Sequence, residues 1–158
     1  MTDVLVATDA DWVYDEVDAS LGDEETAVHR VRTGVEVRPW VKEREPDLVV
    51  LDLQIGNMGG IAACLDLRLE AGAGRIPEPV VLVLLDRQAD VFLARRSEAD
   101  GWLIKPVDSI RLRRAATSLL NGETYYEGVP EEDSEDGSVD VALPAGNEAS
   151  AVVGTSDA

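Results

Sequence analysis

Short apolar runs recur through the first three quarters of the chain and predict the strands of a sheet. Four runs are continuous rather than alternating: Val4–Ala7, Leu48–Leu51, Val80–Leu85 and Trp102–Ile104. Continuous apolar runs are typical of strands that are buried on both faces of a parallel sheet. A fifth run, Thr26–Val31, alternates with polar residues and is predicted to form an edge strand.

Segments with helical periodicity separate these runs. Most of them place an apolar residue at every third or fourth position, which indicates a helix with one buried face. The segments are 11–21, 34–44, 61–69, 89–97 and 108–121. In the third, Ile61, Leu65 and Leu69 are the predicted buried positions, and Asp108 is the predicted N-cap of the last. The strand–helix alternation predicts an α/β domain with a doubly wound parallel sheet.

The charge of the chain narrows the classes of partner. Its 158 residues include 14 Lys and Arg against 32 Asp and Glu, a formal net charge of −18. This balance argues against binding of DNA or RNA, which depends on basic side chains that displace counterions from phosphate. The single cysteine, Cys64, cannot form an internal disulfide, and the N-terminus lacks the basic and apolar regions of a signal peptide. No apolar run is long enough to span a membrane, so we expect a soluble, cytoplasmic protein.

The acidity is concentrated at the C-terminal end. Residues 129–158 hold eight acids, no Lys or Arg and no aromatic residue. Such a segment cannot bury enough apolar surface to offset the entropy that ordering would cost. We therefore predict a folded domain over residues 1–122 and an acidic, disordered tail over residues 123–158. The expected role of the tail is solubility, with an interaction segment as the alternative.

Three of the predicted strands end in charged residues. Asp9 closely follows the first strand, Asp52 ends the third and Lys105 follows the fifth. Because the carboxyl ends of parallel strands meet at one edge of a sheet, we expect these side chains to lie together. Carboxylates are ligands for Mg²⁺, an aspartate can attack phosphorus, and a lysine can neutralise phosphoryl oxygens. This edge is therefore predicted to carry out phosphoryl chemistry.

The motifs at this edge resemble those of response regulator receiver domains. The stretch Pro46–Gly60, PDLVVLDLQIGNMGG, is similar to the phosphorylation-site signature of that family. The stretch Ala99–Asp108, ADGWLIKPVD, is similar to its fifth strand and Lys-Pro pair. With Val4–Asp9 included, the resemblance covers residues 3–121. It implies a flavodoxin-like fold with five parallel strands in the order 2-1-3-4-5.

The resemblance also implies a role for each residue of the site. Asp52 would accept phosphate from a sensor histidine kinase or a phosphotransfer protein, and Lys105 would contact the phosphoryl group. The Lys105–Pro106 bond is expected to be cis. Asp9, Asp52 and the main-chain carbonyl of Gln54 would hold Mg²⁺. The resemblance implies a signalling module of a two-component phosphorelay rather than an enzyme.

Two departures from the family pattern affect this site. Thr8 stands where receivers carry a second acid, so Mg²⁺ is expected to bind more weakly. Thr8 could still position a metal-bound water, and Asp11 could reach the site, although a capping role in the first helix suits Asp11 better. On the fourth strand, Leu84 and Leu85 stand where the family places a hydroxyl that follows the phosphoryl group. Trp102 takes the place of the aromatic residue that moves with that hydroxyl, so the usual switch lacks one of its two partners.

The resemblance and its departures lead to two hypotheses for the function. The first is a stand-alone receiver that signals through protein partners when Asp52 is phosphorylated, because the residues after 121 are too few and too acidic for a DNA-binding domain. The alternative is a phosphorylation-independent pseudo-receiver that acts as an interaction module. Two groups of arginines favour the face formed by the fourth helix, fifth strand and fifth helix as the docking surface: Arg95 and Arg96, and Arg111, Arg113 and Arg114. Homodimerisation is left open.

Overall fold

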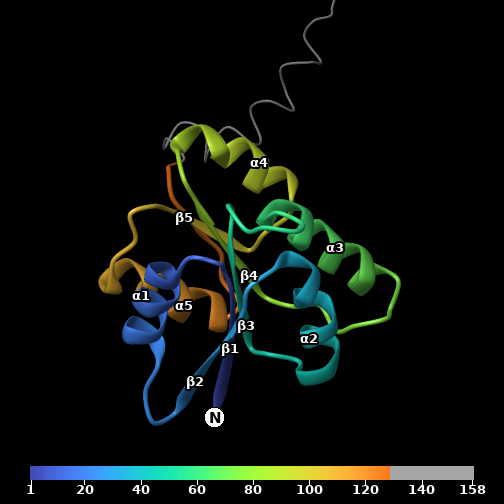
Figure 1. Cartoon of the computed structure of the whole chain (residues 1–158), viewed down its shortest axis with the longest axis horizontal. Helices are drawn as coiled ribbons and strands as arrows, with labels where there is room; N and C mark the ends of the chain where they lie inside the picture. The colour runs from blue at the N-terminus through green and yellow to red at the C-terminus, as the bar shows by residue number, and fades with distance from the viewer. Residues whose placement is uncertain (129–158) are drawn as a thin grey trace, which may run out of the picture. The chain divides into compact units, whose positions relative to one another are not determined.

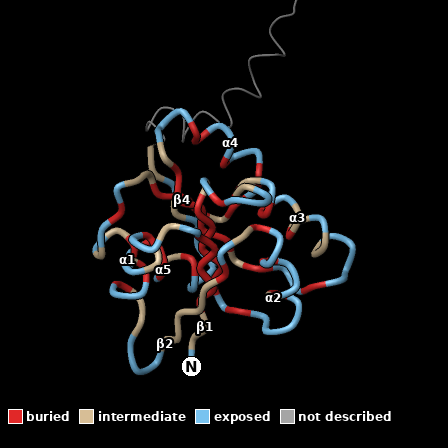
Figure 2. Tube along the Cα trace, viewed as in Figure 1, coloured by how far each residue is buried: buried red, intermediate tan, exposed pale blue. Residues whose placement is uncertain are grey.

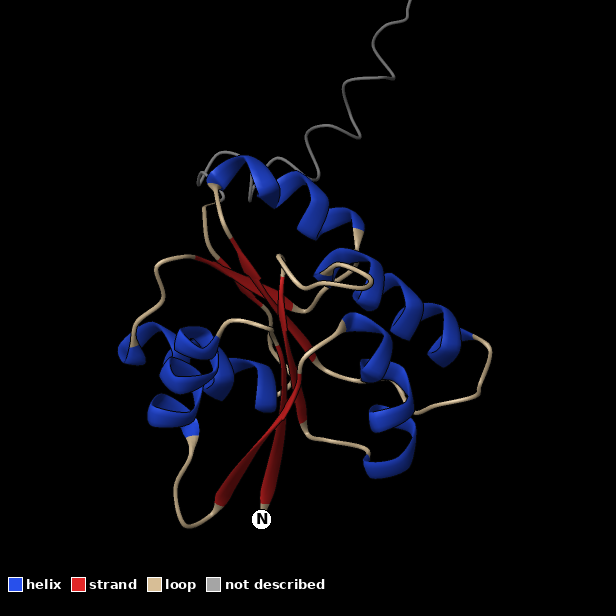
Figure 3. Ribbon diagram, viewed as in Figure 1, coloured by secondary structure: helices blue, strands red, loops and turns tan. Residues whose placement is uncertain are grey.

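The computed structural model describes residues 1–128 (Figures 1 and 3), so the predicted disorder of residues 129–158 lies outside the described residues. Strands and helices alternate along the described chain, as the apolar pattern predicts. The strands are β1 (Thr2–Ala7), β2 (Thr26–Val31), β3 (Leu48–Asp52), β4 (Val81–Leu85), β5 (Gly101–Ile104) and β6 (Tyr125–Tyr126). The helices are α1 (Asp11–Leu21), α2 (Val37–Arg44), α3 (Gly60–Gly72), α4 (Val91–Arg96) and α5 (Ser109–Leu120), with short 3₁₀ turns at Gly34–Glu36 and Gln88–Asp90.

The strands form one parallel sheet in the order β2-β1-β3-β4-β5-β6. Helices α1 and α5 lie together on one side of the sheet, and α2 and α3 lie on the other (Figure 1). The predicted doubly wound α/β fold and the strand order 2-1-3-4-5 are therefore confirmed. Ala7 pairs with Leu51 and Asp52 pairs with Leu84, so the ends of β1, β3 and β4 lie level.

The sixth strand was not predicted, and it moves the end of the folded unit. Tyr125 and Tyr126 pair in parallel with Gly101 and Trp102 of β5. The compact unit extends to Gly128, so the first six residues of the predicted tail belong to the domain. Two tyrosines in a polar segment are too few to produce a period-2 pattern, which is why the sequence did not indicate this strand.

The centre of the sheet is the core of the domain (Figure 2). Every residue of β3 and β4 is buried, as continuous apolar runs predict. On the side of α1 and α5, buried Val13, Val17 and Leu112 pack against it. Asp108 caps α5 as predicted, because its side chain accepts a hydrogen bond from the main-chain N–H of Arg111.

Helix α3 buries a different face from the predicted one. Leu65 and Leu69 are exposed, whereas Ala63, Cys64 and Leu67 are buried. The helix starts close to the sheet: a Cβ on Gly60 would lie 2.5 Å from the main-chain oxygen of Asp52. Such a close approach requires small residues, so the stripe with glycine, alanine and cysteine faces inward. Because α3 is apolar on more than one side, its periodicity could not decide between the faces.

Among the described residues, no helix has the length and hydrophobicity needed to cross a membrane.

Candidate functional site

Asp52 lies at the carboxyl end of β3 and is the centre of the site. Its side chain is only 2% exposed, and both of its carboxylate oxygens are hydrogen-bonded. Oδ1 accepts from Lys105 Nζ at 2.5 Å and from the main-chain N–H of Gln54 at 3.1 Å. Oδ2 accepts from the hydroxyl of Thr8 at 2.6 Å. The predicted convergence of Asp52 and Lys105 at one edge of the sheet is therefore present.

Lys105 lies between two carboxylates. Besides Asp52, its Nζ donates to Oδ1 of Asp86 at 2.8 Å, and its side chain is 13% exposed. The ring of Trp12, which is itself exposed, lies 6.0 Å from Nζ. Burial alone lowers the pKa of Lys105, but the hydrogen bonds and charges of Asp52 and Asp86 outweigh this effect and the pKa is raised. Lys105 is thus held as a cation with a choice of two acceptors.

Asp86 was not among the predicted site residues. It follows β4 directly, where the same rule that selected Asp52 and Lys105 would have placed it at this edge. The family pattern places a hydroxyl on β4 and no acid after it, so it did not indicate Asp86. Asp86 is half-buried rather than enclosed, so its bond to Lys105 is more open to water than that of Asp52.

Thr8 is fully buried and belongs to the hydrogen-bond network of Asp52. Its Oγ1 accepts the main-chain N–H of Ala10 at 3.0 Å while the hydroxyl donates to Asp52. The orientation of the hydroxyl is therefore defined from both sides. Asp11 does not reach this network: its exposed carboxylate binds Arg30 and Arg32, which lowers its pKa. Nor does its side chain cap α1, so the predicted capping role of Asp11 is wrong.

The predicted metal ligands form no cluster of carboxylates among the described residues. Asp9 is exposed, and its Oδ2 accepts a hydrogen bond from the main-chain N–H of Gly56 at 3.3 Å. Within residues 1–128, no group of three or more acidic, histidine or cysteine side chains is placed to hold a metal ion. Thr8 takes the position of the missing acid, and its hydroxyl donates a hydrogen bond to Asp52, whereas a metal ligand must donate an electron pair. The donor set is one carboxylate short, so it does not fit a strong Mg²⁺ site.

The predicted switch positions are all buried apolar or aromatic residues. Leu84 pairs directly with Asp52 across the β3–β4 ladder, and both Leu84 and Leu85 are fully buried. Neither can hydrogen-bond a phosphoryl group. Trp102 is 2% exposed, and its indole Nε1–H donates to the main-chain oxygen of Glu127 at 2.8 Å. The indole is therefore held by a residue of the segment that the sequence analysis assigned to the tail.

The backbone on either side of Lys105 is also fixed. The Lys105–Pro106 bond is cis, as predicted. The main-chain N–H of Lys105 donates to the carbonyl of Leu85 at 2.8 Å, which joins β5 to β4 just before the charged edge.

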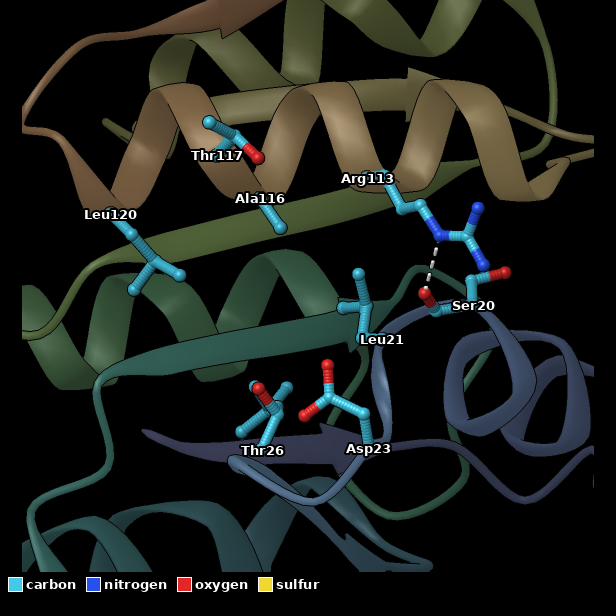
Figure 4. Close-up of a pocket in the computed structure, with 9 residues that line it drawn as sticks. Ser20, Leu21, Asp23, Thr26, Arg113, Ala116, Thr117 and Leu120 are labelled. Carbon is cyan, nitrogen blue, oxygen red and sulfur yellow. Dashed lines mark hydrogen bonds between the residues drawn. The ribbon is translucent and has the colours of Figure 1, made fainter. Parts of the chain in front are cut away.

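A pocket elsewhere on the domain does not belong to this site. It has a volume of about 250 Å³ and opens between the end of α1, the start of β2 and α5 (Figure 4). Arg113 lines it and donates through Nε to the main-chain oxygen of Ser20 at 2.9 Å. Val4 and Thr26 also line it, and both lie toward the amino ends of their strands, whereas Asp52 lies at a carboxyl end.

A doubly wound sheet with an aspartate and a lysine paired at its carboxyl edge defines a class of α/β signalling domains. The model of the response regulator receiver domain matches residues 4–117. The chain therefore belongs to the response regulator receiver domain family, as its motifs indicate.

Known proteins agree with this assignment. The DNA-binding response regulator MtrA of Mycobacterium tuberculosis is 35% identical over 98 residues, which cover 56% of this chain and 41% of MtrA. The chain thus spans less than half the length of this curated relative. A putative response regulator of Chloroflexus aurantiacus superposes with a TM-score of 0.68 at 19% identity, covering 76% of this chain and 98% of that one. Chemotaxis response regulator CheY4 of Vibrio cholerae gives 0.67 at 20% identity, covering 75% and 98%. These two structures show that the fold is shared.

Proposed function

We propose that this receiver domain accepts a phosphoryl group on Asp52 from a phosphohistidine of a sensor kinase or phosphotransfer protein. The observation that carries the proposal is the 2.5 Å hydrogen bond from Lys105 Nζ to Asp52 Oδ1 at the carboxyl edge of the sheet. A carboxylate held beside a cation is suited to attack phosphorus while the cation neutralises charge on the phosphoryl oxygens. Membership of the receiver family supports the same role.

In the proposed step, one carboxylate oxygen of Asp52 forms a bond to phosphorus and the phosphorus–nitrogen bond of the donor breaks. The imidazole leaves with that electron pair and is protonated, and the product on Asp52 is an acyl phosphate. Oδ2 accepts only the uncharged hydrogen bond from Thr8, whereas Oδ1 accepts from the Lys105 cation and from the N–H of Gln54, so Oδ2 is the oxygen that we expect to attack.

The same network affects the proposed dependence on Mg²⁺. Asp9, Asp52 and the carbonyl of Gln54 supply the oxygen ligands that Mg²⁺ prefers, but Thr8 removes one carboxylate from the set. We expect phosphorylation to respond weakly to Mg²⁺. The substitution Thr8→Asp should make the adduct yield depend clearly on Mg²⁺, with Thr8→Val as the control that also removes the hydroxyl but supplies no ligand.

A phosphorylation-independent pseudo-receiver is the second candidate function. The observation that favours it is the hydrogen bond from Thr8, which completes the coordination of a buried Asp52 by neutral and cationic donors of the chain itself. Leu84 and Leu85 also favour the pseudo-receiver, because buried apolar side chains occupy the position where the family carries a hydroxyl. In this function the fold presents one fixed surface to its partner.

Incubation with acetyl phosphate, followed by intact mass measurement, separates the two functions. The wild type should gain an acid-labile adduct with the mass of one phosphoryl group, and Asp52→Asn should gain none. Asp86→Asn is the matched control, because it removes the other carboxylate on Lys105 and leaves the acceptor in place. An adduct that persists in Asp52→Asn would show that the acceptor lies elsewhere. No adduct on the wild type, with or without Mg²⁺, would establish the pseudo-receiver.

The output is proposed to pass through a protein partner. Of the arginines predicted to form the docking surface, Arg111 and Arg113 are engaged within the domain, by Glu127 and by the carbonyl of Ser20. Arg95, Arg96 and Arg114 are exposed. The stand-alone role, the absence of nucleic-acid binding and homodimerisation stay predictions, since MtrA is a DNA-binding regulator and the chain matches less than half of it.

A further inference from the structure

The segment after α5 folds back along the edge of the sheet, and we call residues 123–128 the C-terminal strap. Tyr126 of the strap stacks on Trp102 with ring centroids 4.3 Å apart, and the indole of Trp102 donates to the carbonyl of Glu127. The carbonyl of Gly128 accepts from the side chain of Gln88 at 2.6 Å. The strap is therefore attached at several points to β5 and to the turn that precedes α4.

The side chain of Glu127 extends the β5–β6 hydrogen bonding by one bond beyond Tyr126, the last residue of β6. Its Oε1 accepts the main-chain N–H of Ile104 at 2.9 Å, a donor that a longer β6 would satisfy with a carbonyl. Its carboxylate also pairs with the guanidinium of Arg111, whose Nε donates to Oε2 at 2.6 Å. A carboxylate that binds both a backbone donor and a guanidinium forms strong, directional hydrogen bonds.

Arg111 holds the same stretch of backbone from the other side. It donates to the carbonyl of Ile104 at 2.8 Å and to the carbonyl of Pro106 at 2.6 Å. Together, Glu127 and Arg111 therefore bind the residues immediately before and after Lys105. The hydrogen bond and charge of Glu127 raise the pKa of Arg111, so the guanidinium stays charged at any ordinary pH.

We propose that Glu127 is a positioning residue for Lys105 and that the strap and the Asp52 site are coupled through the backbone of residues 104–106. The proposal rests on the proposed role of Lys105 as the group that meets the phosphoryl. Lys105 is anchored at its Nζ by Asp52 and Asp86 and at its backbone neighbours by Glu127 and Arg111. A change at either anchor strains the other, and such coupling is reciprocal. Release of the Asp52 anchor loosens the strap, and release of the strap loosens Lys105.

The consequence is a route for a signal that does not need the missing hydroxyl on β4. Leu84 and Leu85 cannot follow a phosphoryl group, and Trp102 is held by the strap rather than by a hydroxyl side chain on β4. When Lys105 turns from Asp52 toward a phosphoryl oxygen, the strain reaches Glu127 through one residue of backbone. Opening of the strap then exposes Trp102 and the edge of β5.

The test measures strap opening in the full chain without any phosphodonor. The probes are hydrogen exchange at the amides of Tyr125 and Ile104 and at the indole N–H of Trp102, one of three tryptophans in the chain. Glu127→Ala should speed exchange at these sites about tenfold, the effect of losing charged hydrogen bonds. Glu127→Gln keeps an acceptor for Ile104 and should rescue part of the protection. Glu123→Gln, an exposed position in the strap, is the control and should leave exchange unchanged.

Coupling is then measured by combining these variants with Asp52→Asn. If the strap senses the site, Asp52→Asn should speed exchange in the strap at least about threefold, because couplings of this kind amount to a small multiple of the thermal energy. Asp9→Asn changes an acid at the same edge that is not bonded to Lys105, and it should leave exchange in the strap unchanged. The effects of Asp52→Asn and Glu127→Ala should be less than multiplicative in the double variant.

Each result separates this proposal from the proposed function. Multiplicative effects, or equal exchange in Asp52→Asn and Asp9→Asn, would overturn the coupling whether or not Asp52 is phosphorylated. Coupled exchange in a protein that takes no phosphoryl group from acetyl phosphate would support the coupling and overturn the phosphoacceptor function. Loss of protection in Glu127→Ala without rescue by Glu127→Gln would contradict the role given to the bond between Glu127 and Ile104.

Discussion

The Asp52 site and the C-terminal strap both hold Lys105, but they do so in different environments. At the site, a nearly enclosed carboxylate binds the lysine cation directly, with Thr8 completing its hydrogen bonds. At the strap, a partly exposed Glu127 and Arg111 bind the backbone around the lysine. An ion pair in a dry environment is costly to break on one side, whereas one at the edge is screened by water. The two regions should therefore differ in how much stability they contribute and in how readily they open.

Removal of the lysine head group tests the enclosed region and should have the largest effect. Lys105→Met keeps most of the side-chain volume but leaves Asp52 buried without a cation. We expect the free energy of unfolding to fall by about 3–5 kcal/mol, the usual loss when one partner of a buried pair is removed. Urea unfolding measures this loss. Lys42→Met, at the only other lysine of the chain and exposed on α2, is the control and should change little.

If Lys105→Met lowered the free energy of unfolding no more than Lys42→Met does, the enclosed site would not contribute more stability than an exposed position. The double variant Lys105→Met with Asp52→Asn should recover part of the loss, because it leaves no uncompensated charge in the interior.

The two regions also differ in how far the sequence could predict them. Asp52 and Lys105 each follow a continuous apolar run, and the rule that parallel strands end at one edge is enough to bring them together. Asp86 also follows a continuous apolar run, but the family pattern places a hydroxyl on β4 and no acid after it, so that pattern did not indicate Asp86. Thr8 was predicted to replace an acid and to be able to position a metal-bound water, whereas its hydroxyl donates a hydrogen bond to Asp52, an orientation that depends on the surrounding acceptors.

The strap could not be predicted from pattern. Its strand has two residues, and its stability depends on a stack with Trp102 and on side-chain bonds from Glu127 and Arg111, which lie far apart in sequence. Composition marks the acidity of the C-terminal end but could not indicate that Tyr125 and Tyr126 pair with β5. Likewise, the inward face of α3 depends on how closely Gly60 approaches β3, which periodicity does not encode.

The neutral donor of the enclosed region should have an intermediate effect. Thr8→Val retains the shape of the side chain but leaves an oxygen of the buried Asp52 and the N–H of Ala10 without a partner. We expect a loss of about 1–3 kcal/mol in the free energy of unfolding, the cost of an unsatisfied buried polar group. Thr8→Ser is the control, since it keeps the hydroxyl and should restore most of the stability. A loss in Thr8→Ser equal to that in Thr8→Val would assign the effect to the methyl group instead.

Removal of the aromatic contact of the strap should have a smaller and local effect. Tyr126→Ala deletes the ring that stacks on Trp102, and such aromatic pairs contribute about 0.5–1.5 kcal/mol beyond their buried area. Hydrogen exchange should become faster at Tyr125 and at the indole of Trp102, while the amides of β3 stay protected. Tyr126→Phe keeps the stack and is the control. Faster exchange throughout β3 would show that the strap and the core open together, and would contradict the expected independent opening of the strap.

Alkaline titration distinguishes the two regions, because Lys105 at the Asp52 site loses its proton before Arg111 at the strap does. The pKa of Lys105 is raised by Asp52 and Asp86 against the effect of burial, so folding favours its protonated form. The stability that this pairing contributes is fully present below the ordinary lysine value of 10.5 and is lost as the pH rises through the raised value. The pKa of Arg111 is raised as well, from an ordinary value that is already higher than that of lysine, so Arg111 keeps its charge when Lys105 loses its own.

The difference in free energy of unfolding between the wild type and Lys105→Met should therefore be constant from neutral pH up to about 9 and should narrow above the ordinary lysine value. The difference between the wild type and Glu127→Ala should change much less over the same range, and only by the coupling between the two regions. Parallel decline of both differences would mean that the two regions titrate as one unit, with Lys105 controlling the strap completely.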